Sequence, residues 1–449
     1  MSRTQFSMNY PMVTFAMIVS LAVLLFVPGQ VEAGDWPQWR GPNRDGKSPE
    51  TGLLQEWSEG GPPLAWKTSG IGSGFSSLSV ADGRIFTMGD LEDGQYVLAL
   101  KEDGGEMLWK THVGPIHEDG RGGPRSTPTT DGDRIFATNT EGDVVCLEAD
   151  SGKEVWRVSM TEAYESYMMK AMGSYDWKYA ESPLVDGDKV VVTPGHVQAV
   201  MVALNKITGE EIWKTRGGRI GPLGSDGAAY SSIVVTEIAG VRQYVQLVGR
   251  GVIGVDAATG EMLWSYNRVA NDIANIPTSI VTGDYVFAST GYGTGAALLR
   301  ISKNKDFDEN SEEEQSEWLA DEVYFLEANT MQNHHGGLIL HEGTVFTGSG
   351  HNKGFPVAVA LKTGEVAWGP IRNDGQNSAA ITYADGRIYF RYENGLMILV
   401  EANPEEYIEH GSFPIPDAKK PSWSHPVVAN GKLYLREQDN LFSYDITVH

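Results

Sequence analysis

A short unit that recurs along the chain constrains its fold more than any other feature of the sequence. The clearest copy is residues 131–156, DGDRIFATNTEGDVVCLEADSGKEVW. Gly and Asp mark its turns, because Gly accepts a positive φ and Asp hydrogen-bonds its own backbone, and the runs between the turns are β-branched, aromatic and of strand length. Residues 126–129 add a short leading strand, in which a Pro near the start is tolerated. One copy therefore predicts four antiparallel strands.

The copies recur at the intervals that are typical of propellers. The tryptophan of the outer strand recurs after 43, 47, 57, 51 and then 104 residues, and the last interval contains a further copy whose outer strand is 322–325. Eight leading strands can be counted along the chain, at Ser76, Ser126, Ser182, Ser231, Pro277, Gly336, Ser378 and His425. The sequence therefore predicts eight blades.

The two ends of the repeat array complement each other. The eighth copy stops after strands at 432–435 and 441–444, and an outer strand without a blade of its own stands at 63–66. Pairing these ends would close the ring and remove both exposed sheet edges. We therefore expect residues 34–449 to form one all-β, eight-bladed propeller domain, closed by its N-terminal outer strand.

Charge and the N-terminus bear on the partners and the location of the protein. The net charge is −24, which disfavours nucleic acid as a partner. Arg3, an apolar run over 11–27 and a small-x-small ending at Ala33 predict a signal peptide over 1–33 and an exported protein, periplasmic or secreted, with no membrane span after cleavage. The alternative is an uncleaved anchor, although the run is shorter than the ~20 residues of a spanning helix.

The repeat resembles a known family. Residues 203–213, ALNKITGEEIW, are similar to the pyrroloquinoline quinone (PQQ) repeat, which is found in quinoprotein alcohol dehydrogenases and in BamB proteins. Residues 35–46, DWPQWRGPNRDG, and 333–337, NHHGG, resemble an exported subgroup of such propellers that is abundant in planctomycete-type bacteria. The resemblance implies the propeller fold strongly, whereas a fold shared by enzymes and binding proteins says little about chemistry.

Polar residues just before the leading strands are the candidate ligand-binding residues. In a propeller these positions converge on one mouth of the central channel, whatever their separation in sequence. A protein or a small molecule could bind there; alternatively, the side chains could hydrogen-bond one another and channel water. The candidates are Arg125, Glu181, Tyr230, Asn275, His334, His335, Asn377 and His425.

The resemblance to quinoprotein dehydrogenases implies a possible cofactor site. Those enzymes hold PQQ over a calcium ion that is bound by a Glu and an Asn, and they use an Asp as base and a vicinal disulfide against the quinone. Glu181 and Asn275 would then be the calcium ligands, with Asp226 or Asp272 as the base. Cys146 is the only cysteine, so the vicinal disulfide cannot form.

A metal site at His334 and His335 is not expected from the sequence. Adjacent residues of a regular strand point to opposite faces of the sheet, so the two imidazoles should not reach one ion. A wider cluster that includes His351 and His425 is conceivable.

The sequence thus predicts an exported binding or scaffolding module, similar to BamB in fold. A PQQ- and calcium-dependent dehydrogenase of alcohols or sugars is one alternative. A carbohydrate-binding propeller is the other, favoured by loop aromatics such as Tyr164, Tyr167 and Trp177. The sequence favours a protein that is not an enzyme over a PQQ-dependent dehydrogenase, and it leaves the oligomeric state open.

Overall fold

The computed structural model describes residues 1–2, 34–117, 122–173, 175–218, 220–308, 316–418, 421 and 423–448. The chain divides into two units, Met1–Gln30 and Val31–His449, and every described strand belongs to the second. Residues 3–33, which hold nearly all of the predicted signal peptide, lie outside the described residues. Among the helices of the described parts, none is long and apolar enough to cross a membrane.

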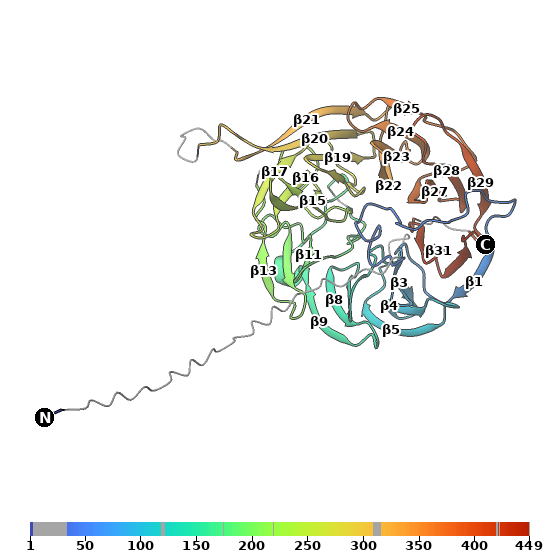
Figure 1. Ribbon diagram of the computed structural model, residues 1–449, viewed down its shortest axis with the longest axis horizontal. Helices are drawn as coiled ribbons and strands as arrows, with labels where there is room; N and C mark the ends of the chain where they lie inside the picture. Colours follow the sequence, from blue (N-terminus) through green and yellow to red (C-terminus); the bar gives the residue numbers. More distant parts are fainter. Residues whose placement is uncertain are drawn as a thin grey trace. The chain divides into compact units, whose positions relative to one another are not determined.

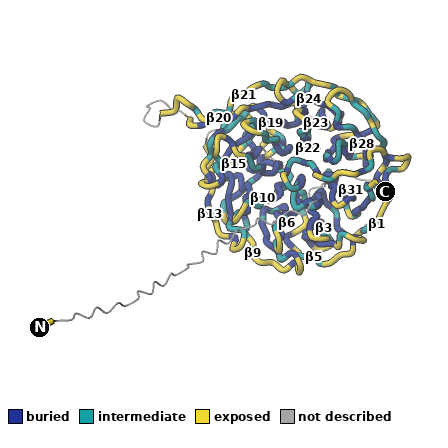
Figure 2. Tube along the Cα trace, in the orientation of Figure 1, coloured by how far each residue is buried: buried dark blue, intermediate teal, exposed yellow. Residues whose placement is uncertain are grey.

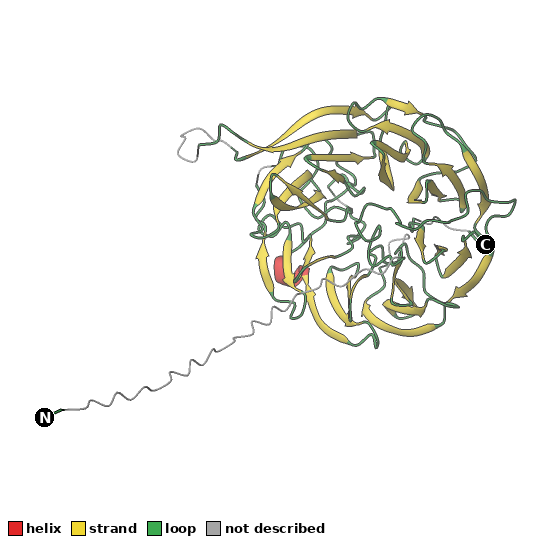
Figure 3. Cartoon of the chain, in the orientation of Figure 1, coloured by secondary structure: helices red, strands yellow, loops and turns green. Residues whose placement is uncertain are grey.

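The second unit consists of eight four-stranded antiparallel sheets set around a ring, as the sequence predicts (Figures 1 and 3). The first four blades are β2 (Ser79–Ala81), β3 (Arg84–Leu91), β4 (Gly94–Lys101) and β5 (Met107–Gly114); β6 (Thr129–Asp131), β7 (Arg134–Thr138), β8 (Asp143–Glu148) and β9 (Glu154–Ser159); β10 (Leu184–Asp186), β11 (Lys189–Val192), β12 (Val202–Asn205) and β13 (Glu211–Lys214); and β14 (Val234–Ile238), β15 (Val241–Val248), β16 (Gly251–Asp256) and β17 (Met262–Tyr266).

The other four blades complete the ring. They are β18 (Ile280–Thr282), β19 (Tyr285–Thr290), β20 (Gly295–Lys303) and β21 (Trp318–Glu327); β22 (Asn333–His341), β23 (Thr344–Ser349), β24 (Phe355–Ala360) and β25 (Val366–Trp368); β26 (Ala379–Ala384), β27 (Arg387–Tyr392), β28 (Leu396–Glu401) and β29 (Glu409–Pro414); and β30 (Val427–Ala429), β31 (Lys432–Glu437) and β32 (Asn440–Asp445), joined by β1 (Leu64–Ser69). Each innermost strand begins within three residues of the position expected from the repeat.

The last blade takes its outer strand from the start of the repeat array, as predicted. β1 pairs antiparallel with β32 from Leu64 opposite Tyr444 to Ser69 opposite Asn440. The ring is therefore closed by main-chain hydrogen bonds, and neither end leaves a bare edge.

The recurring turn and the aromatic residue of the outer strand hold neighbouring blades together. The indole N–H of Trp156 donates to the carbonyl of Lys206 in the next blade, at 3.1 Å. Gly209 lies beneath the same ring, where an added Cβ would come within 2.9 Å of it. Trp109, Trp213 and Trp368 donate in the same way to Ala149, Ala257 and Asn403, and the hydroxyl of Tyr324 donates to Leu361. The repeat motif is thus a contact between blades.

Burial follows the radial order of the strands (Figure 2). β8 is buried at its four central positions, whereas the outer strand β9 is mostly exposed or half-buried. Cys146 lies in β8 and is fully buried, and burial raises the pKa of its thiol to about 12. This thiol is a packing residue, as expected for a small apolar side chain.

Two segments depart from the repeat. α1 (Met160–Tyr164) and the loop that follows it, between β9 and β10, pack Met160, Met168 and Met169 into the core beside Tyr230. The hairpin of β20 and β21 extends outward from the ring (Figure 1), and residues 309–315 between these strands lie outside the described residues.

The segment before β1 runs through the middle of the ring. Trp36 forms an antiparallel bridge with Val80, and Lys47 forms a parallel bridge with Tyr383. Arg44 donates to the carbonyls of Ser182 and Pro183, at 2.7 and 3.1 Å. Residues 35–47, which we name the central segment, thereby contact blades on several sides of the ring.

Candidate functional site

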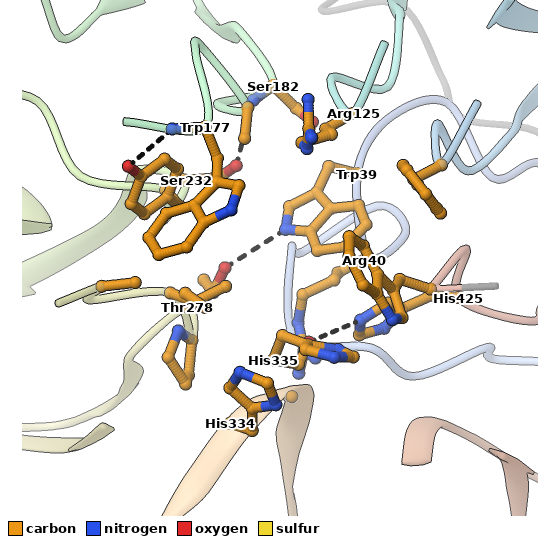
Figure 4. A pocket seen from close by; sticks show the side chains of 18 of the residues that line it. Trp39, Arg40, Arg125, Trp177, Ser182, Ser232, Thr278, His334, His335 and His425 are labelled. Carbon is orange, nitrogen blue, oxygen red and sulfur yellow. Dashed lines mark hydrogen bonds between the residues drawn. The ribbon is translucent and has the colours of Figure 1, made fainter. Parts of the chain in front are cut away.

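A cavity lies where the innermost strands converge on the central segment (Figure 4). Its empty volume is about 940 Å³, part of which is open to solvent. Among the described residues that line it, none is Asp or Glu, and most are aromatic, basic or small. They are Trp39, Arg40, Phe75, Arg125, Trp177, Ala180, Ser182, Tyr230, Ser232, Ala274, Ile276, Pro277, Thr278, Tyr292, His334, His335, Gly337, Trp423 and His425.

The central segment places Trp39 and Arg40 in this cavity. Arg40 adopts a left-handed φ of 60°, which turns the chain sharply. The indole N–H of Trp39 donates to the hydroxyl of Thr278 at 3.2 Å, and its ring packs edge-on against His425 with 4.6 Å between centroids. Trp39 and Arg40 belong to the motif DWPQWRGPNRDG, which lies outside the repeat. The repeat therefore does not predict that this motif lies in the channel, and sequence analysis missed Trp39 and Arg40 as site candidates.

Arg40 is a buried cation with spare hydrogen-bonding capacity. Its side chain donates to the carbonyls of Arg44, Asp45 and Leu338, and its exposed fraction is 3%. The Nη1 atom has no hydrogen-bond partner among the described residues. Burial lowers the pKa of Arg40 to about 10, so the guanidinium still carries its charge at neutral pH. A buried donor of this kind favours an anionic or carbonyl oxygen from a ligand.

Aromatic rings form much of the remaining wall. Phe75 and Trp423 stack with 4.3 Å between centroids, and the guanidinium of Arg125 lies 5.6 Å from the Phe75 ring centre. Elsewhere in the lining, Trp177 packs edge-on against Tyr230 with 5.7 Å between ring centroids, and the Tyr230 hydroxyl accepts from the backbone N–H of Trp177. The wall therefore presents ring faces together with guanidinium groups.

The histidine pair corrects one expectation from the sequence. In β22, Asn333 pairs with Ser349 and the next paired residue, Leu338, pairs with Thr347, so residues between them bulge out of the ladder. The alternation of a regular strand does not apply there, and the His334 and His335 rings lie 4.4 Å apart. The prediction that they point to opposite faces is wrong. Gly336 permits the bulge, because a Cβ would come within 1.5 Å of the Ala379 carbonyl.

Of the residues predicted at the channel mouth, five line the cavity and three do not. Arg125, Tyr230, His334, His335 and His425 are brought together. Asn377 is exposed and outside the lining, with a left-handed φ of 63°. Glu181 and Asn275 are buried behind the wall, with exposed fractions of 3% and 0%. The ligand-binding role of all eight remains a prediction.

Glu181 is satisfied by its own blade and the next. It accepts from the Thr193 backbone N–H at 2.7 Å, from the Thr193 hydroxyl at 2.9 Å and from Gln246 at 3.2 Å. Burial raises the pKa of Glu181 to about 8, against the opposing effects of the two Thr193 hydrogen bonds and of the Arg44 charge. Both carboxyl oxygens are therefore engaged by donors of the protein, and they do not face the cavity.

The other residues named by the dehydrogenase resemblance are also placed elsewhere. Asn275 donates to the carbonyls of Val248 and Gly249, both at 3.0 Å. Asp226 pairs with Arg250 beside a separate small hollow, and Asp272 is exposed. These residues do not converge on the cavity, so the chain does not fit the calcium and PQQ set that the resemblance implies.

Comparison with known proteins gives one consistent result. The family model described as "Outer membrane protein assembly factor BamB" matches residues 93–370. A curated protein of that name from Burkholderia pseudomallei is 27% identical over 256 residues, which is 54% of this chain. The chain spans 59% of the length of that relative.

Solved structures share the fold at low identity. BamB from Moraxella catarrhalis is 16% identical with a TM-score of 0.53, over 85% of this chain and 98% of that chain. Quinohemoprotein alcohol dehydrogenase from Comamonas testosteroni is 12% identical with a TM-score of 0.59, over 93% of this chain and 81% of that chain. Similarity at this level shows the propeller fold alone.

Proposed function

The chain belongs to the BamB family of PQQ-repeat propellers, and we propose that it is an exported binding module that takes a ring-bearing carboxylate into its central cavity. The chemistry of the cavity wall supports this function. Acidic sugars and aromatic acids share the ligand chemistry, since both carry a flat or weakly puckered ring face beside a carboxylate.

The observation that carries the proposal is Arg40. Its guanidinium is buried, charged and without a carboxylate within ion-pair distance among the described residues, and Nη1 has no hydrogen-bond partner. Leaving a buried donor unpaired costs about 1–3 kcal/mol, and more for a charged group. Nη1 is enclosed in the structure, so a ligand carboxylate would accept from it only after a small shift of the Arg40 side chain; this contact would remove the cost and would be shielded from solvent.

The indoles supply the second half of the recognition. Trp39, Trp177 and Trp423 all line the cavity, and they come from the central segment, the loop after α1 and the loop before β30. Sugar rings and aromatic rings both pack against indole faces, and burying such a ring removes apolar surface from water. The ring should therefore lie among the indoles, with its carboxylate toward Arg40.

Calorimetric titration of the full chain tests the proposal. The probes are a glucuronate-containing oligosaccharide, its neutral glucose counterpart, benzoate and PQQ. We expect one of the carboxylates to bind at one per chain and the neutral sugar to bind at least tenfold more weakly, since the Arg40 contact is lost. Comparison of the glucuronate-containing oligosaccharide with benzoate and PQQ distinguishes an acidic sugar ligand from an aromatic acid.

Substitutions locate the binding. Arg40→Gln and Arg125→Gln should each weaken carboxylate binding about tenfold or more. Arg134→Gln is the matched control, because Arg134 pairs with its neighbour Asp133 outside the cavity. Arg125→Gln keeps the test valid if Arg40→Gln fails to fold. Equal binding of the neutral sugar, or dye-linked alcohol oxidation with PQQ and calcium, would overturn the proposal.

A further inference from the structure

We propose that His334, His335 and Glu393 form a binding site for a divalent first-row transition ion in the wall of the central cavity. One potential ligand atom from each residue lies within 4.8 Å of the other two. Two imidazoles and one carboxylate are the protein ligands of many zinc and non-haem iron sites.

The bulge of β22 creates this arrangement. Since residues between Asn333 and Leu338 leave the ladder, both imidazoles can reach the same side of the chain. Glu393 comes from another blade, in the turn between β27 and β28. The three ligands are therefore held by the packing of two blades.

The distance between His335 and Glu393 already suits a shared ion. His335 Nε2 lies 3.3 Å from a Glu393 carboxylate oxygen, and both side chains are 10% exposed. Two ligand atoms at about 2.0–2.1 Å from a tetrahedral zinc are roughly 3.3 Å apart. An ion could therefore replace the proton between these two groups with little movement.

His334 is the third ligand and requires a small rearrangement. Its Nδ1 lies 2.7 Å from the Ser378 hydroxyl and its Nε2 lies 3.1 Å from the Tyr292 hydroxyl. When one nitrogen binds the ion, the other keeps a hydroxyl partner, which fixes the tautomer as the outer partners of metal-bound histidines do.

His351 lies nearby and offers a third imidazole. Its ring lies 4.4 Å from that of His334, and its Nδ1 is buried without a hydrogen-bond partner in the described part of the chain. The Nδ1 of His335 is likewise buried and without a partner. Such nitrogens are uncommon in folded proteins, and they indicate a polar cluster that is incomplete without a further group.

The two histidines of the site lie in the wall of the cavity. His334, His335 and Tyr292 belong to the cavity lining (Figure 4). Three protein ligands leave at least one position of a bound ion for water or an exogenous ligand, which is the arrangement of catalytic and ligand-accepting sites rather than closed structural ones. A metal here would face whatever occupies the cavity.

Equilibrium dialysis of the tag-free full chain against Zn²⁺, followed by elemental analysis, tests the site. We expect one tightly held zinc per chain, and a Co²⁺-substituted protein with the visible absorption of a four- or five-coordinate ion. Glu393→Gln and His335→Gln should weaken zinc binding about 10-fold to 100-fold or more and abolish the Co²⁺ band.

His410→Gln is the matched control, because His410 also pairs with a carboxylate, Glu401, at 2.8 Å but has no second histidine in that pair. This variant should bind zinc as the parent does. Absence of stoichiometric zinc from the parent, or unchanged zinc binding and an unchanged Co²⁺ spectrum in Glu393→Gln, would overturn the proposal. If neither Glu393→Gln nor His335→Gln folds, the Co²⁺ spectrum of the parent protein alone tests whether a four- or five-coordinate ion is bound. This test is independent of the carboxylate titration, so either proposal can fail without the other.

Discussion

At the scale of single residues, burial decides the chemistry of this protein more than residue type does. Glu181 and Arg40 are both ionisable and both almost fully enclosed. Glu181 is surrounded by donors from its own fold and carries a raised pKa, whereas Arg40 retains its charge and one free donor. The first is therefore a structural group, and the second is suited to a ligand.

Glu181→Gln should change how stability depends on pH. Because burial raises the folded-state pKa of Glu181 from 4.5 to about 8, the folded protein holds this proton more tightly than the unfolded chain. The stabilisation from Glu181 is therefore complete below pH 4.5 and is lost as pH rises toward about 8. Gln does not titrate, so the free energy of unfolding of Glu181→Gln should fall less than that of the parent protein as pH rises from 4.5 to 8. The expected difference is about 1–4 kcal/mol.

Urea unfolding at several pH values between these limits measures the effect. Asp188→Asn serves as control, since Asp188 is on the same blade but pairs with Lys189 at the surface. Parallel stability curves for the parent and Glu181→Gln would show that Glu181 titrates normally and would contradict the assignment.

At the scale of elements, the contact between the outer aromatic residue and the next blade explains why the repeat has its sequence. The indole N–H of Trp156 requires a carbonyl acceptor, which Lys206 provides. The indole ring also requires a residue without a side chain against its face, which is Gly209. The TGE turn and the tryptophan are thus two halves of one contact, although they lie in different copies of the repeat.

Trp156→Ala should destabilise the protein by about 3 kcal/mol, because a half-buried indole and its hydrogen bond are lost together. Thermal or urea unfolding measures the change. Lys153→Ala, in the turn just before the same strand, removes an exposed side chain and should change stability by less than about 0.5 kcal/mol. Equal effects of the two substitutions would show that the indole contact contributes nothing specific.

The elements also show where sequence reasoning succeeds and where it fails. Strand order, blade number and ring closure follow from a pattern of turns and strands that recurs along the chain. A strand that is ambiguous in one copy can therefore be assigned by comparison with the other copies. The bulge at His334 and His335 occurs once, and it depends on Gly336 fitting against Ala379 in the next blade. Because no other copy of the repeat contains the contact between Gly336 and Ala379, the sequence gives no sign of the bulge. The expectation that neighbouring strand residues alternate between the two faces of the sheet therefore gave the wrong geometry for His334 and His335.

At the scale of the whole molecule, the repeat builds a ring and the departures from the repeat fill its centre. The central segment lies outside the repeat and brings Trp39 and Arg40 to the middle, and the loop after α1 brings Trp177. Sequence analysis predicted five residues of the cavity lining from their places before leading strands. The central-segment residues were missed, because nothing in their local pattern specifies a position inside a channel.

The location of bound ligand tests the account most directly. Hydrogen–deuterium exchange of the full chain should be compared with and without a saturating carboxylate probe from the titration. We predict that backbone protection increases in the central segment, residues 35–47, and in residues 333–337, while the outer strands β9 and β13 are unchanged. Protection confined to the outer strands or to the β20–β21 hairpin, with none in the central segment, would contradict the assignment of the cavity as the binding site.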